Sequence, residues 1–212
     1  MRQKLSTRNL LIKSMCHLFE SIACVDGQLQ NLKWHQQRLE RSYKALFHSK
    51  SEIDLFKITV PEYAKRGLWK CRLTFDESTN TLDFEPYIRQ KIKTLQLVES
   101  GISYALKFVD RTEIYELIKK RGIADDILII KDDLITDSSK ANVLLFDGNG
   151  WFTPELPLLQ GTMRAQLIET GKVKAKPIAK TDLAFYNKIM LVNAMNPFDE
   201  TRALQLPDAV LN

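Results

Sequence analysis

Residues 102–110 read I-S-Y-A-L-K-F-V-D and place Lys107 inside an apolar stretch. An ammonium group among apolar side chains is poorly solvated, so its pKa falls and the neutral amine becomes accessible. A neutral lysine amine can attack a carbonyl carbon and form a Schiff base. The alternative is a strand lysine whose methylene stem packs while its ammonium group reaches water. The stretch alone leaves both interpretations open, and the sequence on either side of it has to decide.

Two stretches downstream bear on this choice. Residues 135–142 read I-T-D-S-S-K-A-N, and residues 153–164 read T-P-E-L-P-L-L-Q-G-T-M-R. The first contains Asp137, which by itself would be a turn aspartate that accepts backbone N–H groups. The second contains Gly161, after which a helix is predicted over residues 162–170. The N-terminus of such a helix is able to bind an anion.

Upstream, the pattern predicts a small unit built on an antiparallel sheet. Residues 17–25 alternate as a strand does and run into the turn dipeptide Asp26-Gly27. A helix is predicted over residues 33–47, with Asn31 as its N-cap. Extended segments follow over residues 68–76, 81–86 and 89–100. Together these elements indicate an α+β unit.

Residues 100–102, which include Ser100-Gly101, are the predicted connection between two domains. The N-terminal domain is expected over residues 1–99 and the C-terminal domain over residues 103–212. The second is predicted to consist mostly of strands with three short helices. The predicted fold class is therefore α+β, with a small antiparallel N-terminal domain and a larger strand-rich C-terminal domain.

The composition excludes several classes of protein. Apolar residues make up 44% and charged residues 27%, which is typical of a globular chain. No apolar run approaches the roughly 20 residues that span a bilayer, and residues 1–13 lack the apolar core of a signal peptide. The three cysteines, Cys16, Cys24 and Cys71, lack disulfide or zinc spacing and favour a reducing cytoplasm. The three histidines are scattered, so no catalytic metal is expected.

The net charge of +5 raises the question of a nucleic-acid partner. Lysine and arginine are spread along the whole chain and interrupted by acidic residues, and no arginine-rich block occurs. No nucleic-acid partner is therefore predicted. The same positive field suits small anionic ligands such as phosphates and carboxylates.

Four motifs occur in one order between about residues 19 and 197: H-Q-Q-R-L, the apolar-flanked lysine, T-D-S-S-K-A-N, and L-L-Q-G-T-M-R. This order resembles that of the class IV aminotransferases, the fold-type IV pyridoxal-phosphate (PLP) enzymes. The family includes branched-chain and D-amino-acid aminotransferases and aminodeoxychorismate lyase. The resemblance implies the fold-type IV architecture of two domains, a PLP cofactor, amino-acid and keto-acid substrates, and a homodimer.

The resemblance gives the reactive groups their roles. Lys107 would form a Schiff base with PLP and move the proton at the substrate α-carbon. Asp137 would pair with the protonated pyridine nitrogen, a position where relatives carry glutamate. Arg38, by itself an exposed helix arginine off the apolar stripe, would bind the cofactor phosphate.

Further positions follow from the same resemblance. The backbone N–H groups of Thr162 and Met163 would face the phosphate. Leu159 would pack on the cofactor ring, and Asn193 would lie near the phosphate. Substrate candidates are Ser21, where lyase relatives carry a threonine hydroxyl, and two arginines that could receive a carboxylate, Arg72 and Arg89.

The predicted function is that of a class IV aminotransferase working through Lys107. The alternative within the family is an aminodeoxychorismate lyase, which eliminates pyruvate to give 4-aminobenzoate for folate synthesis. A distant alternative is a non-enzymatic module that binds an anionic ligand or nucleic acid. The chain is shorter than typical aminotransferases of this class, and the missing loops belong to the domain that builds the substrate pocket. The substrate therefore stays open at this point.

Overall fold

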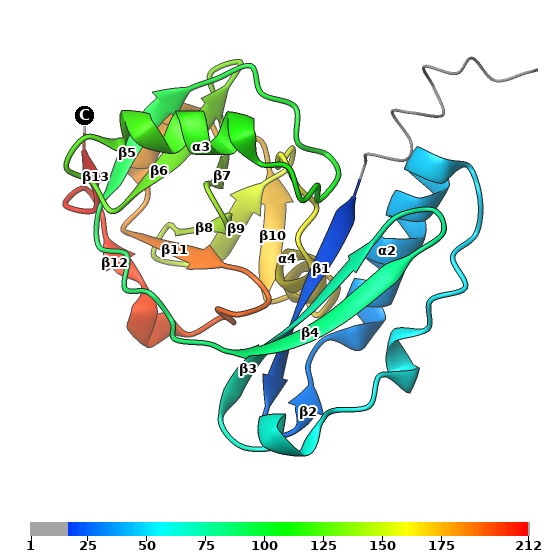
Figure 1. Ribbon diagram of the computed structural model, residues 1–212. Helices are drawn as coiled ribbons and strands as arrows, with labels where there is room; N and C mark the ends of the chain where they lie inside the picture. The colour runs from blue at the N-terminus through cyan, green and yellow to red at the C-terminus, as the bar shows by residue number, and fades with distance from the viewer. Residues whose placement is uncertain (1–16, 212) are drawn as a thin grey trace, which may run out of the picture. The chain divides into compact units, whose positions relative to one another are not determined.

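The computed structural model describes residues 17–211 and divides them into two compact units. The N-terminal unit comprises residues 17–88 together with Leu106–Asp110, and the C-terminal unit comprises Arg89–Ala105 and residues 111–211. Cys16 lies outside the described residues, and so do residues 1–13, where no signal peptide is expected. Figure 1 shows the elements of both units.

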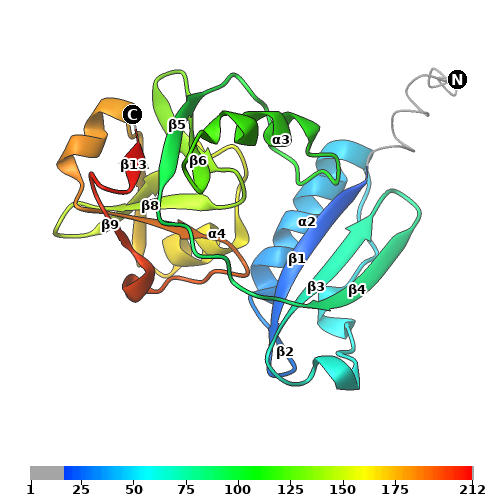
Figure 2. The ribbon, with the colours of Figure 1, turned by 60° about the vertical axis from the view of Figure 1, so that its left-hand side comes forward.

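The N-terminal unit is a four-stranded antiparallel sheet with one long helix against it. The sheet order is β2-β1-β3-β4, formed by Gln28–Leu29, Leu18–Val25, Leu68–Phe75 and Asn80–Pro86. The helix α2 spans Leu32–Phe47 and lies along one face of this sheet (Figure 2). Residues 51–64 form no α-helix; this stretch contains the 3-10 turns Leu55–Lys57 and Glu62–Ala64.

Alternation along β1 and β3 explains how this sheet buries one face. Successive residues of a strand point to opposite sides, so every second residue meets the helix. These inward residues form a closed apolar cluster with α2: Leu18, Ile22, Leu39, Tyr43, Phe47, Cys71, Leu73 and Phe75. The one charged member of the inward row of β1 is Glu20, which is 2% exposed. The intervening residues, such as Phe19 and Ser21, point to the other face.

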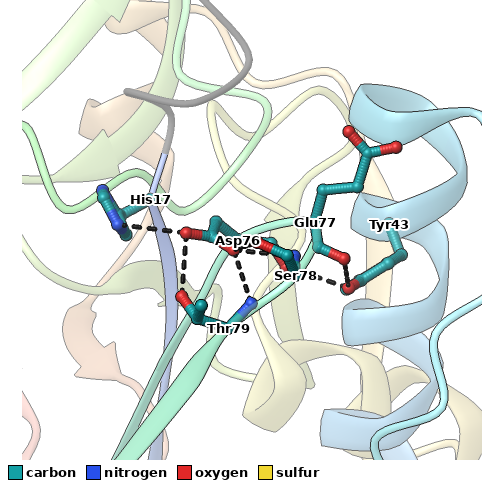
Figure 3. A network of polar contacts seen from close by, with 6 residues as sticks. All are labelled: His17, Tyr43, Asp76, Glu77, Ser78 and Thr79. Carbon is teal, nitrogen blue, oxygen red and sulfur yellow. Dashed lines mark hydrogen bonds and ion pairs between the residues drawn. The ribbon is translucent and has the colours of Figure 1, made fainter.

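The turn between β3 and β4 is fastened to α2 through Asp76 (Figure 3). The Asp76 carboxylate accepts the backbone N–H groups of Ser78 at 2.8 Å and Thr79 at 2.7 Å, and it lies 3.3 Å from Nε2 of His17. The Tyr43 hydroxyl on α2 donates to the backbone oxygens of Asp76 and Glu77, both at 2.9 Å. This polar network orders the turn between β3 and β4 and holds it against α2.

Leu106–Asp110 returns to the N-terminal unit as an added edge. The Phe19 N–H donates to the Lys107 carbonyl at 3.0 Å, and Phe108 forms an isolated bridge with Leu18. Leu106 and Phe108 pack against the same apolar cluster as α2. Because Lys107 stands between them, its side chain is directed to the face that carries Phe19.

The C-terminal unit contains a nine-stranded mixed sheet. Its main order is β10-β9-β8-β7-β6-β5-β13, and β11 pairs with both β8 and β12. The bounds are β5 Leu95–Glu99, β6 Asp126–Lys131, β7 Leu134–Ser138, β8 Asn142–Phe146, β9 Trp151–Pro154, β10 Val173–Lys176, β11 Lys188–Val192, β12 Leu204–Gln205 and β13 Val210–Leu211. The helices are α3 Thr112–Ile118 and α4 Thr162–Glu169, with 3-10 turns at Lys119–Arg121, Lys180–Phe185 and Glu200–Arg202.

The division of the chain differs from the predicted one at 100–102. β5 does not extend the N-terminal sheet, because it pairs in parallel with β6 and buries Leu95 and Val98 in the C-terminal unit. An extended segment exposes hydrogen-bonding groups on both edges, so its pattern does not reveal which sheet it joins. Among the described residues, no helix is both long and apolar enough to cross a membrane.

Candidate active site

In the N-terminal unit, the site is built around the Lys107 side chain. Its Nζ lies 4.5 Å from the centre of the Phe19 ring, which is itself buried. The guanidinium of Arg72 lies 4.1 Å from the same ring centre. A ring face attracts cations through its quadrupole, so Phe19 holds two positive groups at one place on the sheet. The apolar setting predicted for Lys107 is therefore supplied by an aromatic ring.

Arg72 and Ser21 share a row of this sheet. They are directly opposite each other in the pairing of β1 with β3, so their side chains emerge on the same face. Both are half-buried. Within residues 17–211, no carboxylate forms an ion pair with Arg72. The face thus presents a hydroxyl, a guanidinium and the Lys107 amine near the Phe19 ring.

Arg38 belongs to α2, and its side chain points to the face of the sheet that this helix covers. Its Nε donates to Oε1 of Glu20 at 2.8 Å, and its Nη2 donates to Oε2 at 2.5 Å. The side chain is 8% exposed. The helix pattern alone predicts an exposed Arg38, and that prediction is wrong. The pattern assigns every charged residue to the solvent-facing side, whereas Glu20 provides a buried partner for this one.

Glu20 also forms a hydrogen bond with His35, whose Nδ1 lies 2.6 Å from Oε2 of Glu20. Burial by itself would raise the pKa of Glu20, but the Arg38 guanidinium and His35 together outweigh it and lower this pKa to about 2. Burial also lowers the pKa of His35, against the pull of Glu20. The cluster is therefore an ionised carboxylate held by one cation and one neutral ring.

In the C-terminal unit, the site is built around Asp137 near the end of β7. The side chain is 5% exposed. Its Oδ1 accepts Nδ2 of Asn142 at 2.7 Å, and its Oδ2 accepts the backbone N–H of Leu159 at 2.9 Å. These partners differ from the local T-D-S-S turn groups expected for a turn aspartate, because the carboxylate points to the loop before α4.

The charge on Asp137 has no contacting cation among the described residues. Burial raises the pKa of Asp137 to about 7, and the N–H group of Leu159 and the amide of Asn142 offset only part of that cost. Arg164 lowers this pKa from a distance, but its own guanidinium hydrogen bonds go to the end of β9 and to the loop that follows it. Asp137 is thus a buried carboxylate that would gain strongly from a positively charged ligand.

Asn142 links Asp137 to the start of α4. Its Nδ2 also donates to the carbonyl of Leu159 at 2.9 Å, so both amide hydrogens are used. Its Oδ1 faces Gly161, where a β-carbon would lie only 1.8 Å away. No larger residue fits at Gly161 without moving this amide. The motif T-D-S-S-K-A-N contained Asn142, but spacing alone gave it no role.

The start of α4 follows directly. Gly161 is the N-cap, and Thr162 and Met163 occupy the first turn, both buried. The Met163 side chain packs into an apolar cluster with Leu144 and Leu167. The N–H groups and the dipole at a helix N-terminus favour an anion, so this turn suits a phosphate.

Two predicted residues are engaged elsewhere in the C-terminal unit. The Arg89 Nε donates to the carbonyl of Met195 at 2.9 Å, and the rest of this side chain is exposed. Asn193 donates from Nδ2 to the carbonyl of Lys140 at 3.1 Å, and its Oδ1 accepts N–H groups of the 193–196 turn. Both side chains therefore have structural partners.

The predicted residues fall into two groups, each within one unit. The N-terminal unit holds Lys107, Arg72 and Ser21 on one face and Arg38 on the other, while the C-terminal unit holds Asp137, Leu159, Thr162, Met163, Arg89 and Asn193. Sequence reasoning missed Glu20 and Asn142. Glu20 had a weak signal, because it is the only charged residue in the inward row of a strand.

Comparison with known proteins places this arrangement in a family. The sequence profile of the family described as "Amino-transferase class IV" matches residues 105–198. A crystal structure described as a "putative 4-amino-4-deoxychorismate lyase" from Haemophilus somnus is 37% identical, with a TM-score of 0.82, over 87% of this chain and 98% of that one. The chain belongs to the class IV aminotransferase family.

Two further relatives extend this finding. A Haemophilus influenzae protein described as "Uncharacterized protein" is 35% identical over 187 residues, which are 86% of this chain and 99% of that protein. A structure described as a "hypothetical aminotransferase" from Mycobacterium tuberculosis in its PLP-bound form is 16% identical, with a TM-score of 0.76, and covers 97% of this chain and 86% of that one. The second likeness shows the shared fold-type IV architecture.

Enzymes of this class IV family depend on PLP, and amino acids are substrates that fit the family. The residues of the chain fit that cofactor. The buried, uncompensated Asp137 suits the positive ring nitrogen, and Lys107 offers an amine beside an apolar ring. Within the described residues, no group of three or more His, Cys, Asp or Glu side chains could hold a metal ion.

Proposed function

We propose that this chain is a PLP-dependent aminotransferase in which Lys107 carries the cofactor. The observation that carries the proposal is Asp137, a buried carboxylate with a pKa near 7 and no contacting cation among the described residues. Burying an ionised carboxylate without a cation destabilises the folded chain, and a positively charged ligand would offset that effect. A protonated pyridine nitrogen is a ligand of that kind, and Asp137 would keep its proton in place.

Bound PLP supplies an electron sink for the charge left on the substrate α-carbon when its proton is removed. The Nζ of Lys107 would hold the cofactor covalently and then carry this proton. Arg38 and the N–H groups of Thr162 and Met163 would bind the phosphate. Leu159 would pack on the cofactor ring. Asn193 would lie near the phosphate, in the 193–196 turn that its side chain stabilises. Transfer then runs in two halves, from an amino donor to the enzyme and from the enzyme to a keto acid.

Arg72 and Ser21 are proposed to meet the substrate. Their support is their common face with Lys107 and the absence of an ion pair for Arg72 within residues 17–211. The Arg72 guanidinium would receive a substrate carboxylate by paired hydrogen bonds. Arg89 is the weaker of the two arginine candidates, because its Nε already donates to Met195.

The test is spectroscopic. Purified protein mixed with PLP should develop a visible absorbance band that borohydride removes, and Lys107→Ala should lack this band. Lys174→Ala removes an exposed strand lysine and serves as the matched control. If the parent develops no band, or if Lys107→Ala retains it, the proposal is wrong. Amino-acid donors paired with keto-acid acceptors then measure transfer.

A second candidate is the aminodeoxychorismate lyase reaction. Its support is the 37% identity to the Haemophilus somnus protein described by that activity, together with the Ser21 hydroxyl on the Lys107 face. The two reactions separate cleanly in one assay. Release of pyruvate from aminodeoxychorismate without any keto-acid acceptor would favour the lyase, whereas amino transfer without pyruvate release favours the aminotransferase.

We also propose that the enzyme is a homodimer in the cytoplasm. Its support is the family resemblance, and the free thiols of Cys24 and Cys71, which are buried and unpaired, suit a reducing compartment. Light scattering of the PLP-loaded protein would measure the dimer mass of about twice 24.5 kDa. A monomeric mass with full activity would exclude the dimer.

A further inference from the structure

The arginine proposed to bind the cofactor phosphate has a buried carboxylate as its closest partner. Glu20 is 2% exposed and lies in the inward row of β1, among the apolar residues Leu18 and Ile22. It takes the Nε and Nη2 edge of the Arg38 guanidinium, at 2.8 and 2.5 Å. Two parallel hydrogen bonds of this kind fix both the position and the plane of a guanidinium.

The remaining edge of Arg38 has spare donors. A guanidinium has five N–H groups, and within the described residues Arg38 uses one on Nε and one on Nη2. Both hydrogens on Nη1 and the second hydrogen on Nη2 therefore remain for a ligand. A phosphate presents several oxygens to such an edge. The Glu20 contact decides which edge of the arginine is left over.

His35 supports the same carboxylate from one helical turn earlier. It is fully buried, and its Nδ1 lies 2.6 Å from Oε2, the oxygen that also receives Nη2 of Arg38. Residues three apart on a helix lie on one face, so both side chains reach β1 together. Because burial lowers the pKa of His35, the ring is neutral and donates its N–H to the ionised Glu20.

We infer that Glu20, with His35 behind it, is a positioning residue that aims Arg38 at the cofactor phosphate. This inference rests on the proposed function, in which Arg38 binds that phosphate. Stability alone is a weak reason for this cluster, because a buried ion pair is often no more stabilising than apolar residues of the same volume. A rigid guanidinium, by contrast, loses little freedom when a ligand binds.

The experiment compares two ligands that differ only in the phosphate. Dissociation constants for PLP and for pyridoxal, which lacks the phosphate, are measured by the visible absorbance of each complex. Glu20→Gln should weaken PLP roughly tenfold, the size typical for residues that orient a ligand-binding side chain, and leave pyridoxal within about twofold. Arg38→Lys, which keeps the charge and loses the fork, should show the same selectivity.

The double variant Glu20→Gln with Arg38→Lys distinguishes an indirect role from an independent one. If Glu20 acts through Arg38, the double variant binds PLP about as weakly as Arg38→Lys alone, because the two residues are coupled. If the fold losses in PLP affinity of the two single variants multiply in the double variant, the inference is overturned. Glu40→Gln and Arg41→Lys make the same chemical changes at exposed positions of α2 and should leave both constants unchanged.

If Glu20→Gln does not fold, Glu20→Asp takes its place in the experiment, because this variant keeps the negative charge. The shorter side chain withdraws the carboxylate from Arg38, so a smaller loss confined to PLP is expected. An unchanged ratio of the PLP and pyridoxal constants in whichever variant folds overturns the inference, as does equal weakening of both ligands. Absence of PLP binding by the parent chain overturns the proposed function as well, so the two failures are distinguishable.

Discussion

Each of the two units buries one carboxylate beside its own group of candidate residues, and the two carboxylates have opposite character. Glu20 in the N-terminal unit is paired with Arg38, and its pKa falls to about 2. Within the described residues, Asp137 in the C-terminal unit receives only neutral N–H donors, and its pKa rises to about 7. Both are nearly inaccessible to water, at 2% and 5% exposure. Burial therefore does not set the charge state; the presence of a contacting cation does.

The difference indicates two uses of a buried charge. Glu20 has its compensating cation within the chain, so its charge is available to orient Arg38. Asp137 lacks one among the described residues, so its charge becomes stable when a cation arrives. The first arrangement suits a permanent support and the second suits a ligand contact. The following predictions test this contrast.

The largest effect is expected from Asp137→Asn. If the carboxylate holds the ring proton of the cofactor, its loss should lower kcat by about 10²- to 10³-fold, as for other electrostatic groups in dry sites. Glu20→Gln should lower PLP affinity without a comparable fall in kcat at saturating PLP. Steady-state kinetics at high PLP measure both. Equal falls in kcat for the two variants would remove the distinction between the carboxylates.

The pH dependence of stability should also separate the two residues in the PLP-free protein. The folded chain binds the Asp137 proton more tightly than the unfolded chain, whose value is near 3.8, so stability rises by about 4 kcal/mol as the pH falls from 7 to 4. Glu20 works in the other direction. Its contribution of about 3 kcal/mol is present above pH 4.5 and is lost as the pH falls to 2.

Urea unfolding at a series of pH values measures these slopes. Asp137→Asn should remove the rise between pH 7 and 4, and Glu20→Gln should flatten the fall below pH 4.5. Each variant should leave the other window unchanged, because the residues lie in different units. A parental rise that persists in Asp137→Asn would show that another group titrates there.

Gly161→Ala tests the support of Asp137 by sterics rather than charge. The added methyl group would lie 1.8 Å from Oδ1 of Asn142, so the amide that holds Asp137 must move. A destabilisation of about 1–3 kcal/mol is expected, with weaker PLP binding. Gly101→Ala is the matched control, because nothing lies within 4 Å of its added methyl group. Thermal unfolding and PLP titration measure both variants.

The smallest effect is expected at the β3–β4 turn, which carries no proposed role in catalysis. Tyr43→Phe removes the hydroxyl that donates to the backbone oxygens of Asp76 and Glu77. A loss of about 1 kcal/mol in unfolding free energy is expected, with the PLP constant unchanged. A change in PLP affinity would mean that the cluster of Glu20 and Arg38 is sensitive to α2 as a whole.

Much of the fold is readable because the relevant forces are local. The period-two pattern of residues 17–25 predicts β1, and the helix pattern with Asn31 before it predicts α2, which begins at Leu32. The partner of β5 was not predictable, because strand pairing joins residues that are distant in sequence. The same holds for Leu106–Asp110, whose return to β1 depends on hydrogen bonds to Phe19 and His17.

The sequence by itself determined the family, the PLP cofactor and the candidate roles of Lys107, Arg38 and Asp137, because residue type and motif order carry that information. Only the tertiary structure decided the environment of each charge. It paired Arg38 with Glu20, left Asp137 without a cation contact among the described residues, and set Asn142 against Gly161. Solvation and Coulomb energies depend on distances between residues far apart in the chain, and folding sets those distances.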